Sequence, residues 1–228
     1  MKTTAADDAL SRTAPAPDRL VTARLCVLVA GGDDVAVFEQ LVGGLVTAGV
    51  PMLQLRDKQL SDEALFDRCR LALTLARRLA PAAPPLVIVN DRVEVAVAAG
   101  ADGVHLGAGD LPVAEARRRL GPTALIGRTA HSLPEAEAAV AAGADYLGVG
   151  PCFPSATKAF ARHAPRDFLT AAATLSLPVF AIGGIDGGRI EELVGLGLTR
   201  VAVAAAVTAA VDPAAAARRL LAAVAAGG

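Results

Sequence analysis

The chain has 228 residues and a formal net charge of −1, a length that suits one large domain such as an α/β barrel. Hydrophobic residues make up 54% of it, which excludes a chain that is disordered throughout. The balanced charge and the aromatic content of 3% argue against a nucleic-acid partner. The apolar run Val201–Val211 is too short to span a bilayer, so no membrane partner is expected either.

The first 20 residues have a different character from the rest. They contain two prolines and several charged residues, but no apolar segment of the kind that a signal peptide needs. We therefore predict a disordered leader over residues 1–20 and a single domain over residues 21–228.

The three cysteines, Cys26, Cys69 and Cys152, are widely spaced and odd in number. This pattern predicts neither a disulfide framework nor a zinc site. Buried free thiols are the expected state, and they fit a reducing, cytoplasmic location.

After residue 20, short β-branched runs alternate with longer segments rich in Ala, Leu and Arg. The short runs show little polar alternation, which is typical of parallel strands buried on both faces. The predicted strands are Leu25–Ala30, Met52–Leu55, Leu86–Val89, Gly103–Leu106, Leu125–Gly127, Tyr146–Val149, Val179–Ile182 and Val201–Val203. The predicted helices include Asp33–Ala48, Ser61–Ala80, Val93–Ala99, Val113–Leu120, Leu133–Ala142 and Pro213–Ala226.

Local end signals support these helices. Ser61 and Ser132 each stand at the start of a predicted helix and are followed by acidic residues in its first turn. An Ala-Gly pair such as Ala99–Gly100 ends several of the helices. Eight strands alternating with helices predict a (βα)₈ TIM barrel. An open doubly wound sheet is the alternative, but Gly31–Gly32 after the first strand does not form its Gly-rich fingerprint.

Polar residues gather at the C-terminal ends of the predicted strands, which meet at one mouth in a barrel. Asp91 and Asp110 follow adjacent strands and are placed to share one hard cation. Arg56, Lys58 and Lys158 lie at neighbouring strand ends. Because Mg²⁺ commonly takes one or two carboxylates together with substrate phosphates, this set predicts a Mg²⁺–phosphate site.

Each of these residues also has a plain structural interpretation. Asp91 alone could cap the helix near Val93. A single histidine such as His105 or His131 is more often a structural residue than a catalytic base. Cys152 has no base beside it in the sequence to make it a nucleophile. The pair Gly183–Gly184 could bring backbone N–H groups to a second phosphate or could simply form a turn. The shared position of these residues at one mouth favours the functional interpretation.

Five stretches together resemble the thiamine phosphate synthase family, whose members are (βα)₈ enzymes. Their combination and order carry the resemblance, which is spread over most of residues 22–226. The stretches are QLRDK (Gln54–Lys58), NDRVEVAVAAGADGVHLGAGDLP (Asn90–Pro112), IGRTAHS (Ile126–Ser132), ADYLGVGPCFPSATK (Ala144–Lys158) and AIGGI (Ala181–Ile185).

The resemblance implies a Mg²⁺-dependent transferase with two substrate sides. On the metal and pyrimidine diphosphate side it implies Mg²⁺ ligands Asp91 and Asp110, and substrate-binding residues Gln54, Leu55, Arg56, Asp57, Lys58, Asn90, Thr129 and Lys158. Of these, Arg56, Lys58, Thr129 and Lys158 would take part in catalysis. On the thiazole phosphate side it implies Ser155, Ala156, Thr157, Gly184, Ala204 and Ala205.

Several positions depart from the family pattern. Thr129 stands where the family usually has Ser, and Ser155 stands where it usually has Thr. Ala108 stands where Gln is usual after HLG. Ala205 replaces a Ser whose hydroxyl would contact phosphate, and the segment after Lys158 lacks a usual glycine. The metal and diphosphate residues remain, so these changes concentrate on the thiazole side.

The implied reaction joins a hydroxymethylpyrimidine diphosphate to thiazole phosphate, giving thiamine phosphate and diphosphate. A related tautomerase that uses a His in the fifth strand's loop is an alternative, since His131 matches it. A non-catalytic barrel that binds a phosphorylated ligand is another. Family members are often small oligomers, so a homo-oligomer is compatible with the sequence.

Overall fold

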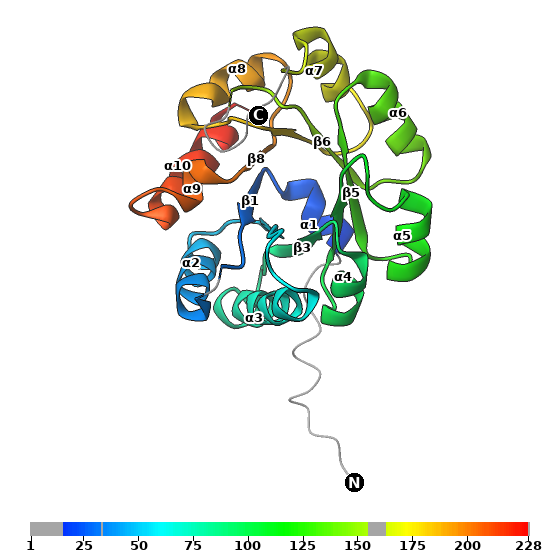
Figure 1. The fold of residues 1–228 in the computed structure, drawn as a ribbon. Helices are drawn as coiled ribbons and strands as arrows, with labels where there is room; N and C mark the ends of the chain where they lie inside the picture. The colour runs from blue at the N-terminus through cyan, green and yellow to red at the C-terminus, as the bar shows by residue number, and fades with distance from the viewer. Residues whose placement is uncertain (1–15, 33, 155–162, 228) are drawn as a thin grey trace.

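The computed structural model describes residues 16–32, 34–154 and 163–227. Eight parallel strands pair in chain order, and β8 pairs back onto β1, so the sheet is a closed barrel (Figure 1). The predicted TIM barrel is confirmed and the open sheet is excluded. The strands are β1 (Leu25–Val29), β2 (Met52–Leu55), β3 (Leu86–Asn90), β4 (Gly103–Leu106), β5 (Leu125–Ala130), β6 (Tyr146–Val149), β7 (Val179–Ile182) and β8 (Val201–Val203).

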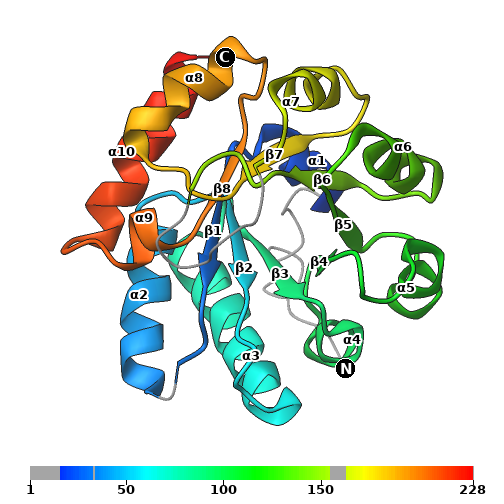
Figure 2. The same cartoon turned by 45° about the horizontal axis from the view of Figure 1, so that its top comes forward.

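Helices surround the barrel (Figure 2). Asp34, Ser61, Ser132 and Asp212 each accept a hydrogen bond from the first turn of the helix that follows, which explains why these helices begin where they do. The helices are α1 (Ala16–Thr22), α2 (Val35–Thr47), α3 (Asp62–Leu79), α4 (Val93–Ala99), α5 (Val113–Leu120), α6 (Leu133–Ala141), α7 (Arg166–Ala173), the 3₁₀ turn η2 (Gly187–Arg189), α8 (Ile190–Gly195), α9 (Ala205–Thr208) and α10 (Pro213–Ala226).

Alternate residues along each strand face the barrel interior or the helices. The interior holds an apolar cluster that includes Met52, Ile88, Tyr146 and Phe180, while residues of the other parity join the larger core beneath the helices. Four polar residues also occupy strand positions whose side chains face the interior, and they lie toward the C-terminal ends of β2 to β5: Gln54, Asn90, His105 and Thr129. The interior is therefore apolar over most of its length and polar near the mouth.

The short helix α1 packs against the N-terminal end of the barrel, and Leu20 is only 3% exposed within the interior cluster. Arg19 forms an ion pair with Asp102 and donates a hydrogen bond to the Pro84 carbonyl at 3.1 Å. The predicted leader boundary is therefore wrong for residues 16–20, which belong to the fold. Residues 1–15 lie outside the described part of the chain.

The predicted buried thiols are confirmed, because all three cysteines are free and buried. Burial raises the pKa of both Cys69 and Cys152 to about 12, so neither supplies a thiolate at neutral pH. None of the described helices combines the length and the apolar content that a bilayer span needs.

We predict that Leu20→Ala lowers the free energy of unfolding by about 2–4 kcal/mol, because it leaves a cavity where α1 closes the barrel. Urea denaturation measures this change. Val21→Ala is the matched control, since Val21 is the next residue of the same helix and is 63% exposed. Equal, near-zero effects of the two substitutions would contradict the assignment of α1 to the fold.

Candidate active site

Asp91 follows β3 in an unusual backbone conformation, with φ at 63°. L-residues enter this left-handed region rarely, and Asp and Asn enter it more easily than most. A hydrogen bond from the Asp91 amide to the His105 carbonyl, at 2.8 Å, stabilises the turn. Arg92 occupies the N-cap position of α4, so the capping interpretation of Asp91 is wrong.

The Asp91 carboxyl lies within hydrogen-bonding range of the Asp110 carboxyl. Partial burial and this acidic neighbour raise the pKa of Asp91 to about 6, although Lys58 and Arg56 act in the opposite direction. Asp110 is held in turn by the Gly107 amide, which donates to its Oδ2 at 2.6 Å. The two carboxylates and two cations named from the sequence therefore share one electrostatic site.

This pair of carboxylates is suited to a particular kind of metal. Within the described ranges, no three or more His, Cys, Asp and Glu side chains gather into a metal-binding group, which argues against a zinc-type site there. Two carboxylates beside the cations Arg56 and Lys58 match the donor set of Mg²⁺, which keeps open positions for substrate oxygens. The donor set fits the predicted metal.

Asp57 organises the loop between β2 and α3. Its carboxylate accepts hydrogen bonds from the Gln59 amide at 2.9 Å and the Gly32 amide at 3.1 Å. Partial burial acts to raise the pKa of Asp57, but the backbone hydrogen bonds outweigh it and the net pKa is lowered. Arg92 holds the same loop by donating to the Leu60 carbonyl at 2.6 Å. Asp57 and Arg92 thus position Lys58.

The side chain of Leu55 does not take part in the contact with substrate that is expected of this residue. Leu55 is 0% exposed and belongs to the core beneath the helices, because it has the opposite parity to Gln54 on β2. Its side chain faces away from the interior, so the QLRDK motif reaches the mouth through other residues.

Four side chains form a hydrogen-bonded row across the polar end of the interior, which we call the polar row: Gln54, Tyr146, His105 and Thr129. His105 contacts the Tyr146 hydroxyl through Nδ1 at 3.2 Å and the Thr129 hydroxyl through Nε2 at 2.8 Å. Gln54 lies within hydrogen-bonding range of the Tyr146 hydroxyl. The motifs of the sequence do not point to Tyr146 as a site residue; the available signal was the pair of glycines inside neighbouring strands, Gly127 and Gly148.

Two further residues, His131 and Arg128, lie near the mouth on β5 and its loop. His131 is exposed, and its Nδ1 lies 2.6 Å from the Gly150 carbonyl. Arg128 donates to the Ala108 carbonyl at 3.2 Å and so links β5 to the loop that carries Asp110. Nδ1 of His131 therefore has a backbone partner, as a structural histidine would.

The Gly183–Gly184 pair has a steric role. Gly184 has φ at 65°, and a Cβ there would lie 2.3 Å from the Pro154 carbonyl oxygen, so glycine lets the segment after β6 pass close by. The helical turn after this pair is already capped, because Asp186 accepts from the Gly188 amide at 3.0 Å. By contrast, α9 begins after Ala204, whose side chain has no polar atom to cap it.

The remaining residues predicted for the thiazole side, Ser155–Lys158, lie outside the described residues. The structure thus brings Gln54, Arg56, Lys58, Asp91 and Asp110 toward one mouth, and Ala204–Ala205 follow β8 at the same end of the barrel.

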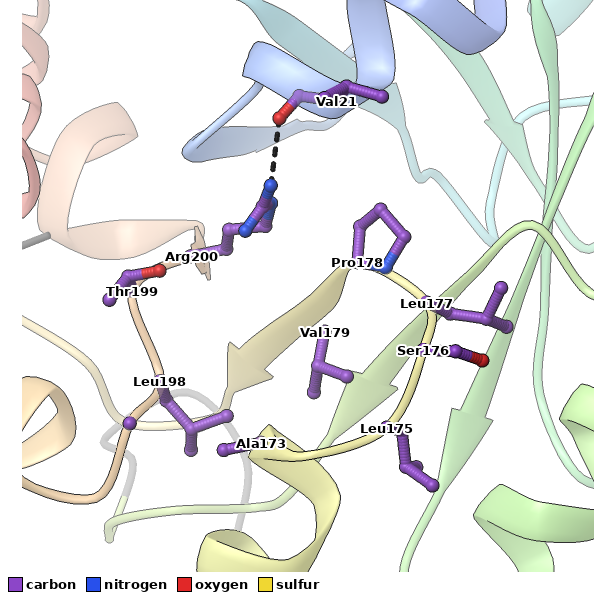
Figure 3. A pocket seen from close by; sticks show the side chains of 11 residues that line it. Val21, Ala173, Leu175, Ser176, Leu177, Pro178, Val179, Leu198, Thr199 and Arg200 are labelled. Atoms are coloured by element: carbon purple, nitrogen blue, oxygen red, sulfur yellow. Dashed lines mark hydrogen bonds between the residues drawn. The ribbon is translucent and has the colours of Figure 1, made fainter.

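A cavity of about 360 Å³ opens away from these residues, at the N-terminal end of the barrel. Leu175, Pro178 and Leu198 line it together with Arg200, whose guanidinium donates to the Val21 carbonyl at 2.8 Å (Figure 3). No residue of the predicted site is among its lining residues, and catalytic groups of TIM barrels lie at the opposite end. The candidate active site is therefore the mouth and not this cavity.

The sequence matches the family profile described as "Thiamine monophosphate synthase" over residues 25–207. The chain belongs to this family. Thiamine-phosphate synthase of Anaeromyxobacter dehalogenans is 45% identical over 207 residues, which cover 89% of this chain and 88% of that protein. The corresponding protein of Rhodopirellula baltica is 41% identical over 194 residues, covering 82% of this chain and 51% of that protein.

The chain spans about half the length of several curated family relatives. The fold agrees with a solved structure of the same family along nearly its whole length. Thiamine phosphate pyrophosphorylase from Pyrococcus furiosus superposes with a TM-score of 0.79 at 31% identity, covering 92% of this chain and 98% of that one. This member of the thiamine monophosphate synthase family thus has the same barrel fold as the solved structure.

We predict that Asp91→Asn stabilises the metal-free protein at pH 8 by about 1 kcal/mol, a value reduced for solvent screening. Asn tolerates the left-handed backbone and removes the repulsion from Asp110. The folded-state pKa is raised from 3.8 to about 6, so the native state binds the proton more tightly than the unfolded state. Wild-type stability therefore falls as the pH rises from about 4 to 6 and then levels off.

Urea denaturation across this pH range, with a chelator present, measures the difference between the two proteins. The difference should be small near pH 4 and reach its full size above pH 6. Asp67→Asn, on an exposed position of α3, is the matched control. A difference that does not vary with pH would contradict the electrostatic coupling of Asp91 and Asp110.

Proposed function

We propose that this protein is a Mg²⁺-dependent thiamine phosphate synthase. The reaction transfers the hydroxymethylpyrimidine group from its diphosphate to thiazole phosphate. The observation that carries the proposal is the Asp91–Asp110 pair facing Arg56 and Lys58 at the mouth, in a chain of this family. A tautomerase would not need this combination of carboxylates and cations, and the comparisons do not favour one.

The chemistry asks for stabilisation of a leaving group. The bond between the pyrimidine methylene carbon and a diphosphate oxygen breaks, and the diphosphate leaves with the electron pair. Arg56 and Lys58 bind its oxygens and neutralise the growing charge, with Lys158 assigned to the same task by family resemblance. Mg²⁺ held by Asp91 and Asp110 would supply further charge neutralisation to the diphosphate.

The thiazole nitrogen then forms the new bond to the methylene carbon with its own lone pair. This step removes no proton, so it needs no strong protein base, and positioning supplies much of the rate. Gln54 and Asn90 would hold the pyrimidine ring from the interior end of β2 and β3. Backbone N–H groups near Gly184, Ala204 and Ala205 would hold the thiazole phosphate together with Ser155–Thr157.

We further propose a cytoplasmic location, which the free, buried cysteines support. A homo-oligomer is compatible with this function.

The direct test is an assay of the purified protein with both substrates, in which thiamine phosphate is measured with Mg²⁺ and with a chelator. We expect product only with Mg²⁺. Asp110→Asn should lower kcat by about a hundredfold or more, because it removes a charged metal ligand while its amide oxygen can still accept from the Gly107 amide. Wild-type rates in the variant at saturating Mg²⁺ would remove the metal assignment, and an inactive wild type would overturn the proposed function.

A second prediction concerns Ala205, which lacks the hydroxyl usual at this position. A hydrogen bond to a charged group contributes about 1.5–3 kcal/mol, so Ala205→Ser should lower KM for thiazole phosphate about tenfold. KM for the pyrimidine diphosphate should not change. Steady-state kinetics of both substrates in wild type and variant measures this, and an unchanged thiazole KM would show that the backbone N–H groups suffice.

A further inference from the structure

The polar row is a buried hydrogen-bonded chain that the reaction as proposed above does not explain. Gln54 is 4% exposed, Tyr146 2% and His105 7%, while Thr129 at the end of the row is half-buried near the mouth. The row runs from Gln54 to Tyr146, then to His105 and then to Thr129. It links two residues assigned to substrate through two that are not.

The backbone makes room for this row at two strand positions. A Cβ on Gly127 would lie 2.1 Å from the Tyr146 ring and 2.5 Å from His105 Nδ1, and one on Gly148 would lie 3.2 Å from His105 Cε1. Glycine inside a strand weakens it. Both glycines face the His105 ring, and Gly127 also faces the Tyr146 ring. They indicate that the barrel accommodates these rings at a local cost.

The row has two possible directions, because one nitrogen of a neutral imidazole donates and the other accepts. His105 Nδ1 lies 3.2 Å from the Tyr146 hydroxyl and Nε2 lies 2.8 Å from the Thr129 hydroxyl. In the first direction, the Tyr146 hydroxyl donates to Nδ1 and Nε2–H donates to Thr129. In the second, Nδ1–H donates to Tyr146 and the Thr129 hydroxyl donates to Nε2.

We propose that His105 is a positioning residue that accepts from Tyr146 and donates to the Thr129 hydroxyl, so that the Thr129 proton points to a substrate diphosphate oxygen. The proposal rests on the proposed function, which places an anionic diphosphate at this mouth. The opposite direction would turn a lone pair of Thr129 toward that anion and repel it. The His105 imidazole thus makes Thr129 the donor in its hydrogen bond to the diphosphate, although His105 does not contact the diphosphate itself.

The polarity can be measured on the wild-type protein without substrate. In ¹⁵N NMR of histidine-labelled protein at pH 7, His105 should show a protonated Nε2 and an unprotonated Nδ1, identified by comparison with His105→Gln. The Nδ1–H tautomer or a doubly protonated ring would overturn the proposal, because Tyr146 could then no longer donate to Nδ1.

Two conservative variants separate the two sides of the imidazole. Gln at position 105 places an amide near the position of Nε2 and can still donate to Thr129, whereas Asn places its amide near Nδ1 and cannot reach Thr129. We expect His105→Asn to lower kcat by about tenfold to a hundredfold, which is the effect of losing one hydrogen bond to a charged group. We expect His105→Gln to lower kcat by less than about threefold. KM should change less than kcat, because the charge on the diphosphate grows in the transition state.

A double-mutant cycle tests whether His105 acts through Thr129. In a Thr129→Ala background, His105→Asn should lower kcat by less than about twofold, since the hydroxyl to be oriented is gone. Met52→Ala is the stability control: Met52 is 0% exposed in the apolar interior, so its loss should lower Tm but leave kcat unchanged at temperatures well below Tm.

The outcomes distinguish the two proposals. An inactive wild type refutes the proposed function, whereas the tautomer measurement does not depend on activity. An active wild type with equal kcat in His105→Asn and His105→Gln refutes the positioning role alone. A loss in His105→Asn of the same size with and without Thr129 also refutes it, because a purely structural role produces that result.

Discussion

The alternation of side chains in a closed parallel barrel is the constraint on which the site depends. Successive residues of a strand face opposite sides, and closure leaves no strand edge at which this rule relaxes. Gln54 therefore enters the interior and Leu55 joins the core beneath the helices, although both belong to one motif. The same rule brings Asn90, His105 and Thr129 to the polar end of the interior from three neighbouring strands. The chemistry of the mouth follows from parity more than from proximity in the sequence.

The two ends of the barrel have opposite energetic characters. At the mouth, Asp91 has a left-handed backbone and lies beside a second carboxylate, and both features are unfavourable for the protein alone. At the other end, α1 adds Leu20 to the apolar interior and an ion pair from Arg19 to Asp102. Elements that stabilise the fold and elements that bind charge are thus separated along the barrel axis, as is general for TIM barrels. Unfavourable electrostatics at the mouth can persist because they are not needed for closure of the sheet.

Much of the fold was predictable, because buried parallel strands are short, apolar and β-branched. All eight strands begin at the predicted residues. β5 runs to Ala130, beyond the predicted Gly127, since Arg128 and Thr129 break the apolar pattern while keeping the strand pairing to β6. α1 was missed because one buried leucine in seven residues gives no periodicity, and its main partner Asp102 is 83 positions from Arg19. The carboxylates and cations were predictable from their places after strands, whereas the roles of Asp57 and Tyr146 depend on contacts between loops and strands that spacing does not reveal.

Thr129 shows how such contacts add to a motif. The family usually has serine here, and either hydroxyl can donate to an anion. Threonine is branched at Cβ and has fewer accessible χ1 rotamers than serine, and its oxygen lies 2.8 Å from His105 Nε2. The side-chain torsion and the hydroxyl direction are then both restricted before substrate arrives, so less conformational entropy is lost on binding. Catalytic hydrogen bonds contribute most when their donors are already oriented. In the reaction that we propose, the Thr129–His105 contact would therefore connect the rigidity of the barrel interior to the chemistry at the mouth.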